Sequence, residues 1–217
     1  MMTTYAPLVR VVDDDSAFRT AVCRLLRAAG YRVREFASAG EFLMTDSHEE
    51  AGCVLLDVRM PGASGLDLQA SLAKREPSLP IIFLTAYGDV PLSVQAMKGG
   101  ASDFLAKPVP RDELLCAIRA ALARDEHDRT KRSELRSLRS CYSALSKRER
   151  EVLQYVVAGR LNKQIAAAIG ASERTVKAHR ARVMEKMRAS SVADLVRAAD
   201  RLLAGGAGTR EAQSEPA

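Results

Sequence analysis

The chain has 217 residues, 47% of them hydrophobic and 28% charged, which suffices for one large or two small globular domains. Its four cysteines are scattered with no CxxC pair, which argues against a zinc site or a disulfide framework and favours a reducing cytoplasm. No apolar run approaches the length of a membrane span and no signal-peptide pattern opens the chain, so we expect a cytoplasmic protein with no membrane partner.

Charge is distributed unevenly along the chain. Residues 1–123 carry 13 Lys and Arg against 15 Asp and Glu, whereas residues 146–204 carry 13 against 6. An acidic half joined to a basic half indicates two domains with different tasks, and the basic half favours a polyanionic partner.

Residues 1–123 alternate five times between a short apolar run and a segment with apolar residues at helical spacing. The expected strands are 8–12, 31–36, 53–57, 80–85 and 102–106. The expected helices fall in residues 18–29, 41–45, 66–73, 91–97 and from 112 onward. This alternation predicts an α/β fold, a doubly wound parallel sheet of five strands.

Polar residues stand where the expected strands end: Asp13 and Asp14 after the first, Asp57 after the third, Thr85 after the fourth and Lys107 after the fifth. Ligand sites of open parallel sheets lie outside the carboxyl ends of the strands, so we expect these five side chains to share one crevice. Three carboxylates repel one another unless a cation joins them, and Mg²⁺ suits a site of hard oxygen ligands.

This set of residues suits the transfer of a phosphoryl group onto Asp57. A carboxylate is a competent nucleophile toward phosphorus, and a metal ion together with Lys107 would neutralise charge on the transferring oxygens. Taken singly, Asp13 or Asp14 is more often a helix cap, and Lys107 is more often an ordinary surface residue. The combination favours a phosphoacceptor site.

Residues 8–123 resemble the receiver domain of a two-component response regulator, which has a flavodoxin-like fold. The resemblance rests on Val-Val-Asp-Asp at 11–14, Leu-Asp-Val-Arg-Met-Pro-Gly at 56–62, Leu-Thr-Ala at 84–86 and Asp-Phe-Leu-Ala-Lys-Pro at 103–108. It implies that Asp57 accepts a phosphoryl group from a sensor histidine kinase. It also implies that Mg²⁺ (or Mn²⁺) is held by Asp13, Asp14, Asp57 and the backbone carbonyl of Arg59.

The same resemblance assigns Thr85 and Phe104 as a switch pair. A phosphoryl group brings negative charge and strong acceptor oxygens, so Thr85 could donate to it while Phe104 turns inward to fill the vacated space. The plainer interpretation of Phe104 is an ordinary core aromatic. An enzyme that hydrolyses its own aspartyl phosphate would need a second carboxylate just beyond the nucleophile, where Arg59 stands instead. We therefore expect at most metal-dependent self-phosphorylation from small donors and slow self-dephosphorylation.

Residues 124–145 are rich in charge and contain neither Pro nor Gly. Apolar side chains recur there at three- and four-residue spacing, namely Leu135, Leu138, Tyr142 and Leu145. The sequence leaves open a continuation of the preceding helix, a separate helix and a solvated flexible linker. It also leaves open whether the apolar stripe packs on a domain or on a second chain.

Residues 146–204 predict a small all-α domain of four helices. Ser146 begins the first helix with a capping box, 162–169 form the second, and Ser172 and Ser191 cap the third and the fourth. A helix, a glycine-containing turn and a basic helix make a helix-turn-helix candidate, although bundles that bind no DNA share this outline.

The third helix of this domain carries a basic face. At about 100° per residue, Val176, Val183 and Met187 lie on the side that faces the core. The opposite side carries Arg174, Thr175, Lys177, Ala178, Ala181 and Arg182. Small residues between long basic ones would let this helix approach the floor of the major groove of double-stranded DNA. His179 and Arg180 lie nearer the core edge, where they could reach phosphates or simply pack, and Lys163 is a candidate phosphate contact.

This second segment resembles the LuxR/FixJ-type DNA-binding domain. The resemblance rests on Leu-Ser-Lys-Arg-Glu-Arg-Glu-Val-Leu at 145–153, Asn-Lys-Gln-Ile-Ala at 162–166 and Thr-Val-Lys-Ala-His-Arg at 175–180. Both resemblances together indicate a response regulator of the FixJ/NarL class and not an enzyme. They imply homodimerisation on phosphorylation, binding of promoter DNA and a partnership with RNA polymerase.

The expected organisation is a receiver domain, a helical linker, a helix-turn-helix domain and a disordered tail, at 1–123, 124–145, 146–204 and 205–217. Two alternatives to this interpretation are an output that binds RNA or protein, and a regulator that needs no phosphate. The complete acidic pocket with Thr85 and Lys107 counts against the second alternative. A steep salt dependence with a preference for duplex would count against the first.

Overall fold

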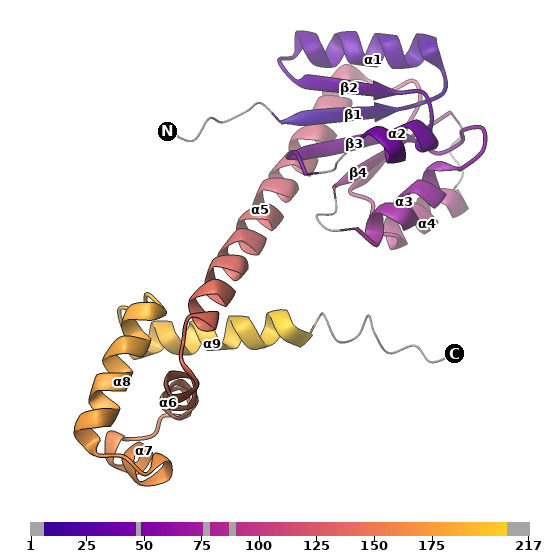
Figure 1. The fold of residues 1–217 in the computed structure, drawn as a ribbon. Coiled ribbons are helices and arrows are strands. Elements are labelled where there is room, and N and C mark those ends of the chain that lie inside the picture. Colours follow the sequence, from indigo (N-terminus) through magenta and orange to yellow (C-terminus); the bar gives the residue numbers. More distant parts are fainter. Residues whose placement is uncertain (1–6, 47–48, 76–78, 87–89, 208–217) are drawn as a thin grey trace, which may run out of the picture. The chain divides into compact units, whose positions relative to one another are not determined.

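The computed structural model describes residues 7–46, 49–75, 79–86 and 90–207, with the backbone alone for 205–207. The chain divides into two compact units, one ending at Arg129 and the other beginning at Thr130 (Figure 1). Helix α5 (Arg111–Ser143) contributes residues to both units. The structure therefore has one continuous helix where the sequence left open a continuation, a second helix or a flexible linker.

The first unit is a five-stranded parallel sheet with strand order β2-β1-β3-β4-β5. Its strands are β1 (Leu8–Val12), β2 (Arg32–Phe36), β3 (Gly52–Asp57), β4 (Ile81–Thr85) and β5 (Asp103–Ala106). Its helices are α1 (Ser16–Ala28), α2 (Ala39–Thr45), α3 (Gly65–Ala73), α4 (Val90–Lys98) and the first part of α5. The predicted doubly wound α/β fold is confirmed, and its strand order reverses between β1 and β3.

Two apolar cores cover the two faces of this sheet. Successive residues of a strand point to opposite faces, so Cys53 and Leu55 enter one core while Val54 and Leu56 enter the other. Helices α1 and α5 pack on the first face, and α2, α3 and α4 pack on the second. Because β3 is buried on both faces, its sequence is a continuous apolar run instead of an alternation.

The turn after β3 returns closely to the end of that strand. Gly65 N donates to the Val58 carbonyl at 3.0 Å. A Cβ at Gly65 would lie 2.2 Å from the carbonyl oxygen of Asp57, so this close approach requires glycine. Ser64 and Asp67 then form the capping box that begins α3. The backbone on the carboxyl side of Asp57 is therefore held against the strand.

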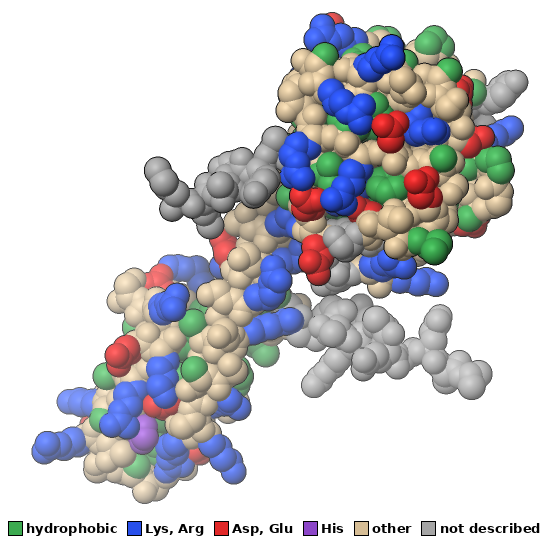
Figure 2. Space-filling view, turned by 45° about the horizontal axis from the view of Figure 1, so that its top comes forward, with side chains coloured by type: hydrophobic (Ala, Val, Ile, Leu, Met, Phe, Trp, Pro, Cys, Tyr) green, Lys and Arg blue, Asp and Glu red, His purple; other side chains and the backbone are tan. Residues whose placement is uncertain are grey.

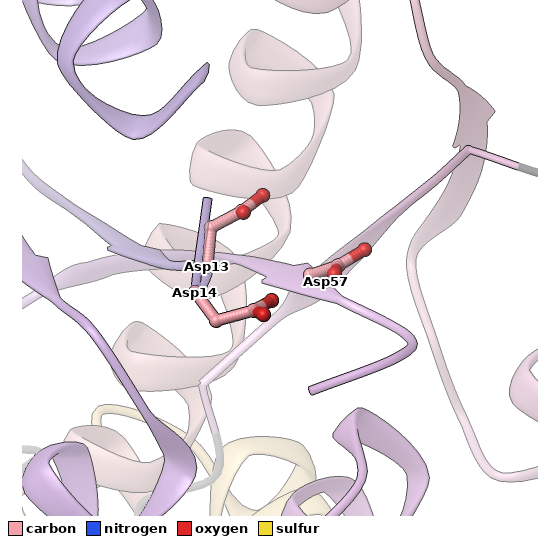
Figure 3. Close-up of side chains that lie close together, drawn as sticks. All are labelled: Asp13, Asp14 and Asp57. Carbon is pink, nitrogen blue, oxygen red and sulfur yellow. The ribbon is translucent and has the colours of Figure 1, made fainter. Parts of the chain in front are cut away.

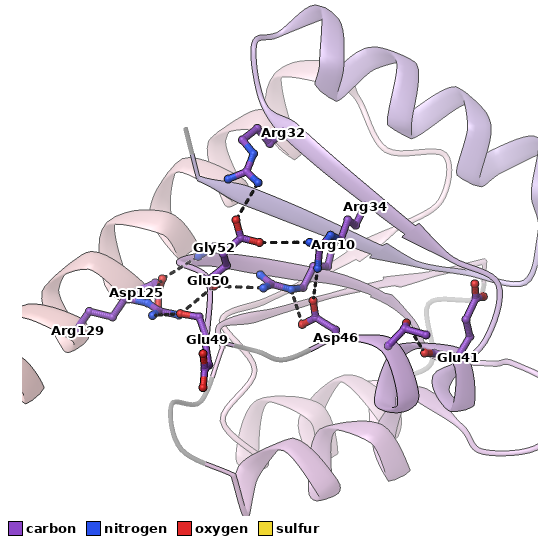
Figure 4. A network of polar contacts seen from close by, with 11 residues as sticks. Arg10, Arg32, Arg34, Glu41, Asp46, Glu49, Glu50, Gly52, Asp125 and Arg129 are labelled. Atoms are coloured by element: carbon purple, nitrogen blue, oxygen red, sulfur yellow. Dashed lines mark hydrogen bonds and ion pairs between the residues drawn. The ribbon is translucent and has the colours of Figure 1, made fainter. Parts of the chain in front are cut away.

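A charged residue lies buried in the middle of β1. Arg10 is fully buried, and its Nε donates to Asp46 Oδ2 at 2.7 Å, an ion pair that is itself shielded from water. Burial lowers the pKa of Arg10 from its ordinary value, and the charge of Asp46 opposes that effect. The pair ties β1 to the segment that follows α2 (Figure 4).

Helix α5 is fastened to the start of β3 by a second group of polar contacts. Asp125 Oδ2 accepts from Gly52 N at 2.9 Å and from Arg129 Nε at 2.7 Å. Arg129 also donates to two backbone carbonyls, those of Glu49 and Glu50, at 2.7 and 3.1 Å (Figure 4). The first unit therefore extends along α5 to Arg129, beyond the predicted domain boundary at 123.

The second unit is all-α. Its helices are the end of α5, α6 (Lys147–Val157), α7 (Asn162–Ile169), α8 (Glu173–Lys186) and α9 (Val192–Ala207). Each of α6 to α9 contributes fully buried residues to a single core, namely Val152, Ile165, Val176, Val183 and Leu195. Ser146, Ser172 and Ser191 cap α6, α8 and α9 as predicted.

Most of the apolar stripe of the charged segment belongs to this second core, while Leu135 is half-buried on α5. Leu138, Cys141 and Tyr142 of α5 pack against it, and Leu145 is buried within it. The ring of Tyr142 also lies 5.3 Å from the Arg150 guanidinium of α6. The stripe thus packs on a domain of its own chain, which is one of the two possibilities that the sequence left open.

Helix α9 continues through two glycines to Ala207, so the first three residues of the segment predicted to be disordered, 205–207, are helical. Glycine weakens a helix but does not forbid it. The remainder of that predicted tail, 208–217, lies outside the described residues. Among the helices that the structure describes, none combines the length and the apolar character needed to cross a membrane.

Candidate functional site

Three carboxylates gather at the ends of β1 and β3 (Figure 3). Asp13 and Asp14 directly follow β1, and Asp57 is the last residue of β3. One carboxylate oxygen from each lies within 4.8 Å of the others. Because β1 and β3 are adjacent in the sheet and the strand order reverses between them, this is where an open α/β sheet keeps its ligand site.

Lys107 joins this cluster from the end of β5. Its Nζ lies 2.6 Å from Asp13 Oδ2 and 3.3 Å from Asp57 Oδ1. The lysine and both carboxylates are largely shielded from water, with side-chain exposures of 14%, 1% and 11%. The ammonium is therefore held between two buried acids and provides a fixed positive charge there.

The net negative charge of the cluster favours the binding of a further cation. Burial raises the pKa of Asp57 above its ordinary value; Lys107 opposes this rise, while the charges of Asp13 and Asp14 reinforce it. Three carboxylates with one lysine carry excess negative charge. Carboxylate oxygens at this spacing fit Mg²⁺, which prefers hard oxygen donors and keeps several of its waters. The residues present thus fit the divalent metal site expected from the sequence.

The remaining receiver residues singled out in the sequence lie on β4 and β5 or just beyond the end of β3. Thr85 ends β4 and is 2% exposed, one residue beyond the point where β4 pairs with Asp57. Phe104 in β5 is half-buried and packs on the second core, with its ring centroid 6.2 Å from that of Phe83. Arg59 is exposed just beyond the strand end.

Two residues that touch the cluster were not singled out from the sequence. The ring centroid of Phe18 lies 4.2 Å from Lys107 Nζ, and Arg19 Nη1 donates to the Asp13 carbonyl at 2.5 Å. Phe18 begins the expected helix at 18–29, and its helical spacing is that of a core residue. No local pattern could have paired it with a lysine at the far end of the domain's sequence.

In the second unit, α8 has a buried side and a basic exposed side. Val176 and Val183 are fully buried. The exposed residues of the opposite side are Arg174, Thr175, Lys177, Ala178, Ala181 and Arg182. The structure therefore has the two faces that helical spacing predicts, and Lys and Arg side chains stand out from the visible face of this unit (Figure 2).

The edges of α8 are held by polar contacts. His179 and Arg180 are half-buried, and Arg180 Nη1 donates to Asn162 Oδ1 of α7 at 3.0 Å. Ser172 Oγ accepts from Thr175 N at 3.1 Å and lies 2.8 Å from the Thr175 hydroxyl. These contacts fix the start of α8 and its register against α7.

The far end of α8 is tied to α6, since Lys186 Nζ donates to the buried Glu149 at 2.7 Å. Lys163, in the first turn of α7, is exposed. Helix α8 is thus anchored at both ends while its basic side remains open to solvent.

Comparison with known proteins identifies both units. A family model for the response regulator receiver domain matches residues 9–119, and a model for bacterial regulatory proteins of the luxR family matches residues 143–199. The chain belongs to the two-component response regulators of the FixJ/NarL class. This response regulator is therefore, by family, a transcription regulator with a receiver and a LuxR-type DNA-binding domain.

Individual relatives match this response regulator over most of their length. Nodulation protein W of Bradyrhizobium diazoefficiens is 46% identical over 195 residues, which cover 90% of this chain and 86% of that protein. FixJ of Azorhizobium caulinodans is 44% identical over 197 residues, which cover 91% and 92%. The solved structure of the response regulator StyR is similar with a TM-score of 0.83 and 43% identity, covering 91% of this chain and 100% of that one.

Proposed function

We propose that this response regulator accepts a phosphoryl group on Asp57 from a sensor histidine kinase, dimerises, and regulates transcription by binding promoter DNA through α8. The observation that carries the first step is the position of Asp57. Its carboxylate lies 3.3 Å from the Lys107 ammonium and within 4.8 Å of two further carboxylates. That arrangement serves an acceptor of phosphate far better than a buried structural acid.

In the transfer step, a carboxylate oxygen of Asp57 attacks the phosphorus of the kinase's phosphohistidine. An O–P bond forms, the N–P bond breaks, and the departing imidazole nitrogen keeps the electron pair of that bond and takes a proton from solvent. Lys107 lies where it would neutralise charge on the transferring oxygens. A divalent ion held by Asp13, Asp14, Asp57 and the Arg59 carbonyl would supply further neutralisation of the phosphoryl oxygens.

Phosphorylation would act on the rest of the receiver through a change in charge. The new group adds negative charge and acceptor oxygens at the end of β3. Thr85, at the end of the neighbouring strand, would donate to it, and Phe104 would follow inward. The altered face formed by α4, β5 and α5 would then favour a homodimer, which presents two copies of α8 to two half-sites.

At the promoter, the exposed basic side of α8 would enter the major groove. Arg174, Thr175, Lys177 and Arg182 would read or approach bases, while Lys163 and His179 would contact phosphates. Contact with RNA polymerase completes the proposed output. Duplex DNA is favoured over RNA as the partner because α7, the turn at Gly170 and the basic α8 follow one another in the order of a helix-turn-helix.

The first step is tested by incubating the purified protein with phosphoramidate and Mg²⁺ and measuring the mass of the intact chain. We expect the wild type to gain one phosphoryl group that hydroxylamine removes, and Asp57→Asn to gain none. Asp112→Asn changes an exposed carboxylate in the first turn of α5 and should be phosphorylated like the wild type. Equal incorporation in Asp57→Asn and the wild type would contradict the proposal.

A further inference from the structure

Phe18 stands out because it touches the cluster without being a charged or polar member of it. It lies in the first turn of α1, is half-buried, and packs against the core on that face of the sheet. Its ring centroid lies 4.2 Å from Lys107 Nζ. This distance is well inside the range in which the face of an aromatic ring attracts an ammonium.

The ammonium of Lys107 is surrounded on three sides. It has three N–H donors and no acceptor. Asp13 Oδ2 accepts a hydrogen bond from it at 2.6 Å, Asp57 Oδ1 forms an ion pair with it at 3.3 Å, and the Phe18 ring lies against it as well. Water therefore has little access to this charge, in keeping with a side-chain exposure of 14% for the lysine.

The backbone of Phe18 is held by the acidic segment itself. Asp15 N donates to Asp13 Oδ1 at 3.0 Å, and Phe18 N donates to Asp15 Oδ1 at 3.1 Å. The side chain of Asp15 is the N-cap of α1. The backbone of Phe18 is thus tied through two hydrogen bonds to the same carboxylate that pairs with Lys107.

We propose that Phe18 is a positioning residue, whose ring holds the Lys107 ammonium beside Asp57 in the place where a phosphoryl oxygen arrives. The inference rests on the proposed function of Asp57 as phosphoacceptor. A free lysine side chain has many rotamers and a strongly hydrated charge. Without the ring, one side of the Lys107 ammonium is open to water, and the side chain spends part of its time away from Asp57.

The plainer role for Phe18 is apolar cover of the core, which leucine would fill as well. The two roles separate on substitution. Phe18→Leu keeps an apolar side chain and removes the ring face, whereas Phe18→Tyr keeps the ring face. Tyr31→Leu provides the matched control, because Tyr31 packs on the same core beyond the other end of α1.

The first measurement needs neither metal nor phosphate. A ring above the ammonium shifts the ε-methylene protons of Lys107 upfield in the spectrum of the resting protein. We expect Phe18→Leu to return these signals to ordinary lysine positions, while Phe18→Tyr and Tyr31→Leu leave them shifted. Unchanged signals in Phe18→Leu would overturn the proposal.

The second measurement is the rate of phosphorylation by phosphoramidate. We expect Phe18→Leu to lower this rate about 3- to 10-fold, the effect expected of one cation–π contact, and Phe18→Tyr to restore most of it. In a Lys107→Gln background, Phe18→Leu should have no further effect. Wild-type rates in Phe18→Leu, or a full Phe18→Leu effect without Lys107, would overturn the proposal.

Failure of the proposed function gives a different result. If the wild type takes no phosphate at Asp57, the proposed function fails, and the methylene signals alone decide whether Phe18 holds the ammonium. If the wild type is phosphorylated and Phe18→Leu behaves like it, the proposed function stands and the positioning role fails.

Discussion

Glu149 is almost fully buried at the start of α6 and has partners on two elements. Its side chain accepts from Lys186 Nζ of α8 at 2.7 Å and from Ser146 N at 2.8 Å. The hydrogen bond from Lys186 first, and that from the Ser146 backbone next, lower the pKa of Glu149 from 4.5 to about 2. A single carboxylate therefore both caps α6 and anchors the end of the basic helix.

We expect Glu149→Gln to destabilise the second unit by about 2 kcal/mol at neutral pH, the usual worth of hydrogen bonds to a charged group. Because the pKa of Glu149 is lower in the folded than in the unfolded state, this stabilisation is complete above the unfolded value of 4.5 and is lost as the pH falls toward 2. The difference between variant and wild type in urea unfolding, followed by circular dichroism, should therefore shrink on acidification from about pH 5 to about pH 3.

The matched control is Glu151→Gln in the same helix. Glu151 pairs with Arg148 at a half-exposed position, and such surface pairs contribute little, so its removal should change stability by less than about 0.5 kcal/mol. A Glu149→Gln penalty that stays constant across the acid range would show that the charge of Glu149 does not carry the stabilisation.

At the scale of elements, α5 is fastened to the receiver by its own side chains before it enters the second unit. Asp125 is 2% exposed and joins α5 to Gly52 at the start of β3, and Arg129 adds the carbonyls of Glu49 and Glu50. These are the last residues of α5 that belong to the first unit. Asp125 and Arg129 therefore join the end of the receiver part of α5 to the backbone at 49–52, and we call this group of polar contacts the clasp.

We expect Arg129→Met to lower the free energy of unfolding of the receiver by about 2 kcal/mol, because the buried Asp125 carboxylate loses its arginine partner. Amide exchange in the last turns of α5 before Arg129 should accelerate in the same variant. Arg124→Met removes an exposed arginine from the same helix and should change neither quantity. Stability and exchange rates equal to wild type in Arg129→Met would mean that the clasp does not hold α5.

Much of the fold could be predicted because individual strands and helices carry a recognisable local pattern of apolar and polar residues. Residues 53–57 are adjacent apolar residues ending in an acid, as expected of a strand buried on both faces. The meeting of Asp13, Asp57 and Lys107 follows from a general rule about the ends of parallel strands, so it needed no knowledge of side-chain packing.

What escaped prediction depends on partners distant in sequence. Arg10 interrupts an apolar strand and is buried because Asp46, 36 residues later, satisfies its charge. Phe18 has the spacing of a core residue, yet it also meets Lys107 in the folded receiver. The segment 205–217 is predicted to be disordered, but α9 continues through Gly205 and Gly206 to Ala207 because glycine only weakens helical structure.

At the scale of the whole molecule, acidic and basic residues are distributed differently over the two domains. The receiver segment 1–123 has slightly more acids than bases and buries Asp13 and Asp57 at the acidic cluster, whereas residues 146–204 carry 13 Lys and Arg against 6 Asp and Glu. Excess positive charge promotes encounter with any duplex, and base contacts from α8 would supply the sequence preference. Under the proposed function, phosphorylation would change dimerisation, while the DNA-binding face itself need not change.

Separate variants should therefore affect phosphorylation-dependent dimerisation and DNA binding independently. With DNA fragments selected from genomic DNA by the phosphorylated wild type, we expect phosphoramidate to promote dimerisation and tighten binding in the wild type but not in Asp57→Asn. Arg182→Ala, on the exposed side of α8, should dimerise normally on phosphorylation yet bind these fragments about 10-fold more weakly. Light scattering reports the dimer, and fluorescence anisotropy at fixed salt reports the DNA affinity.

Arg136→Ala is the control for charge alone, because it removes an exposed arginine of the second unit that lies on α5 and not on α8. Its DNA affinity should stay within about 2-fold of wild type, since one peripheral charge adds only a small, salt-dependent contribution. Equal losses in Arg136→Ala and Arg182→Ala would mean that total charge, and not the face of α8, determines binding. Phosphate-dependent binding by Asp57→Asn would instead separate DNA recognition from the acidic cluster altogether.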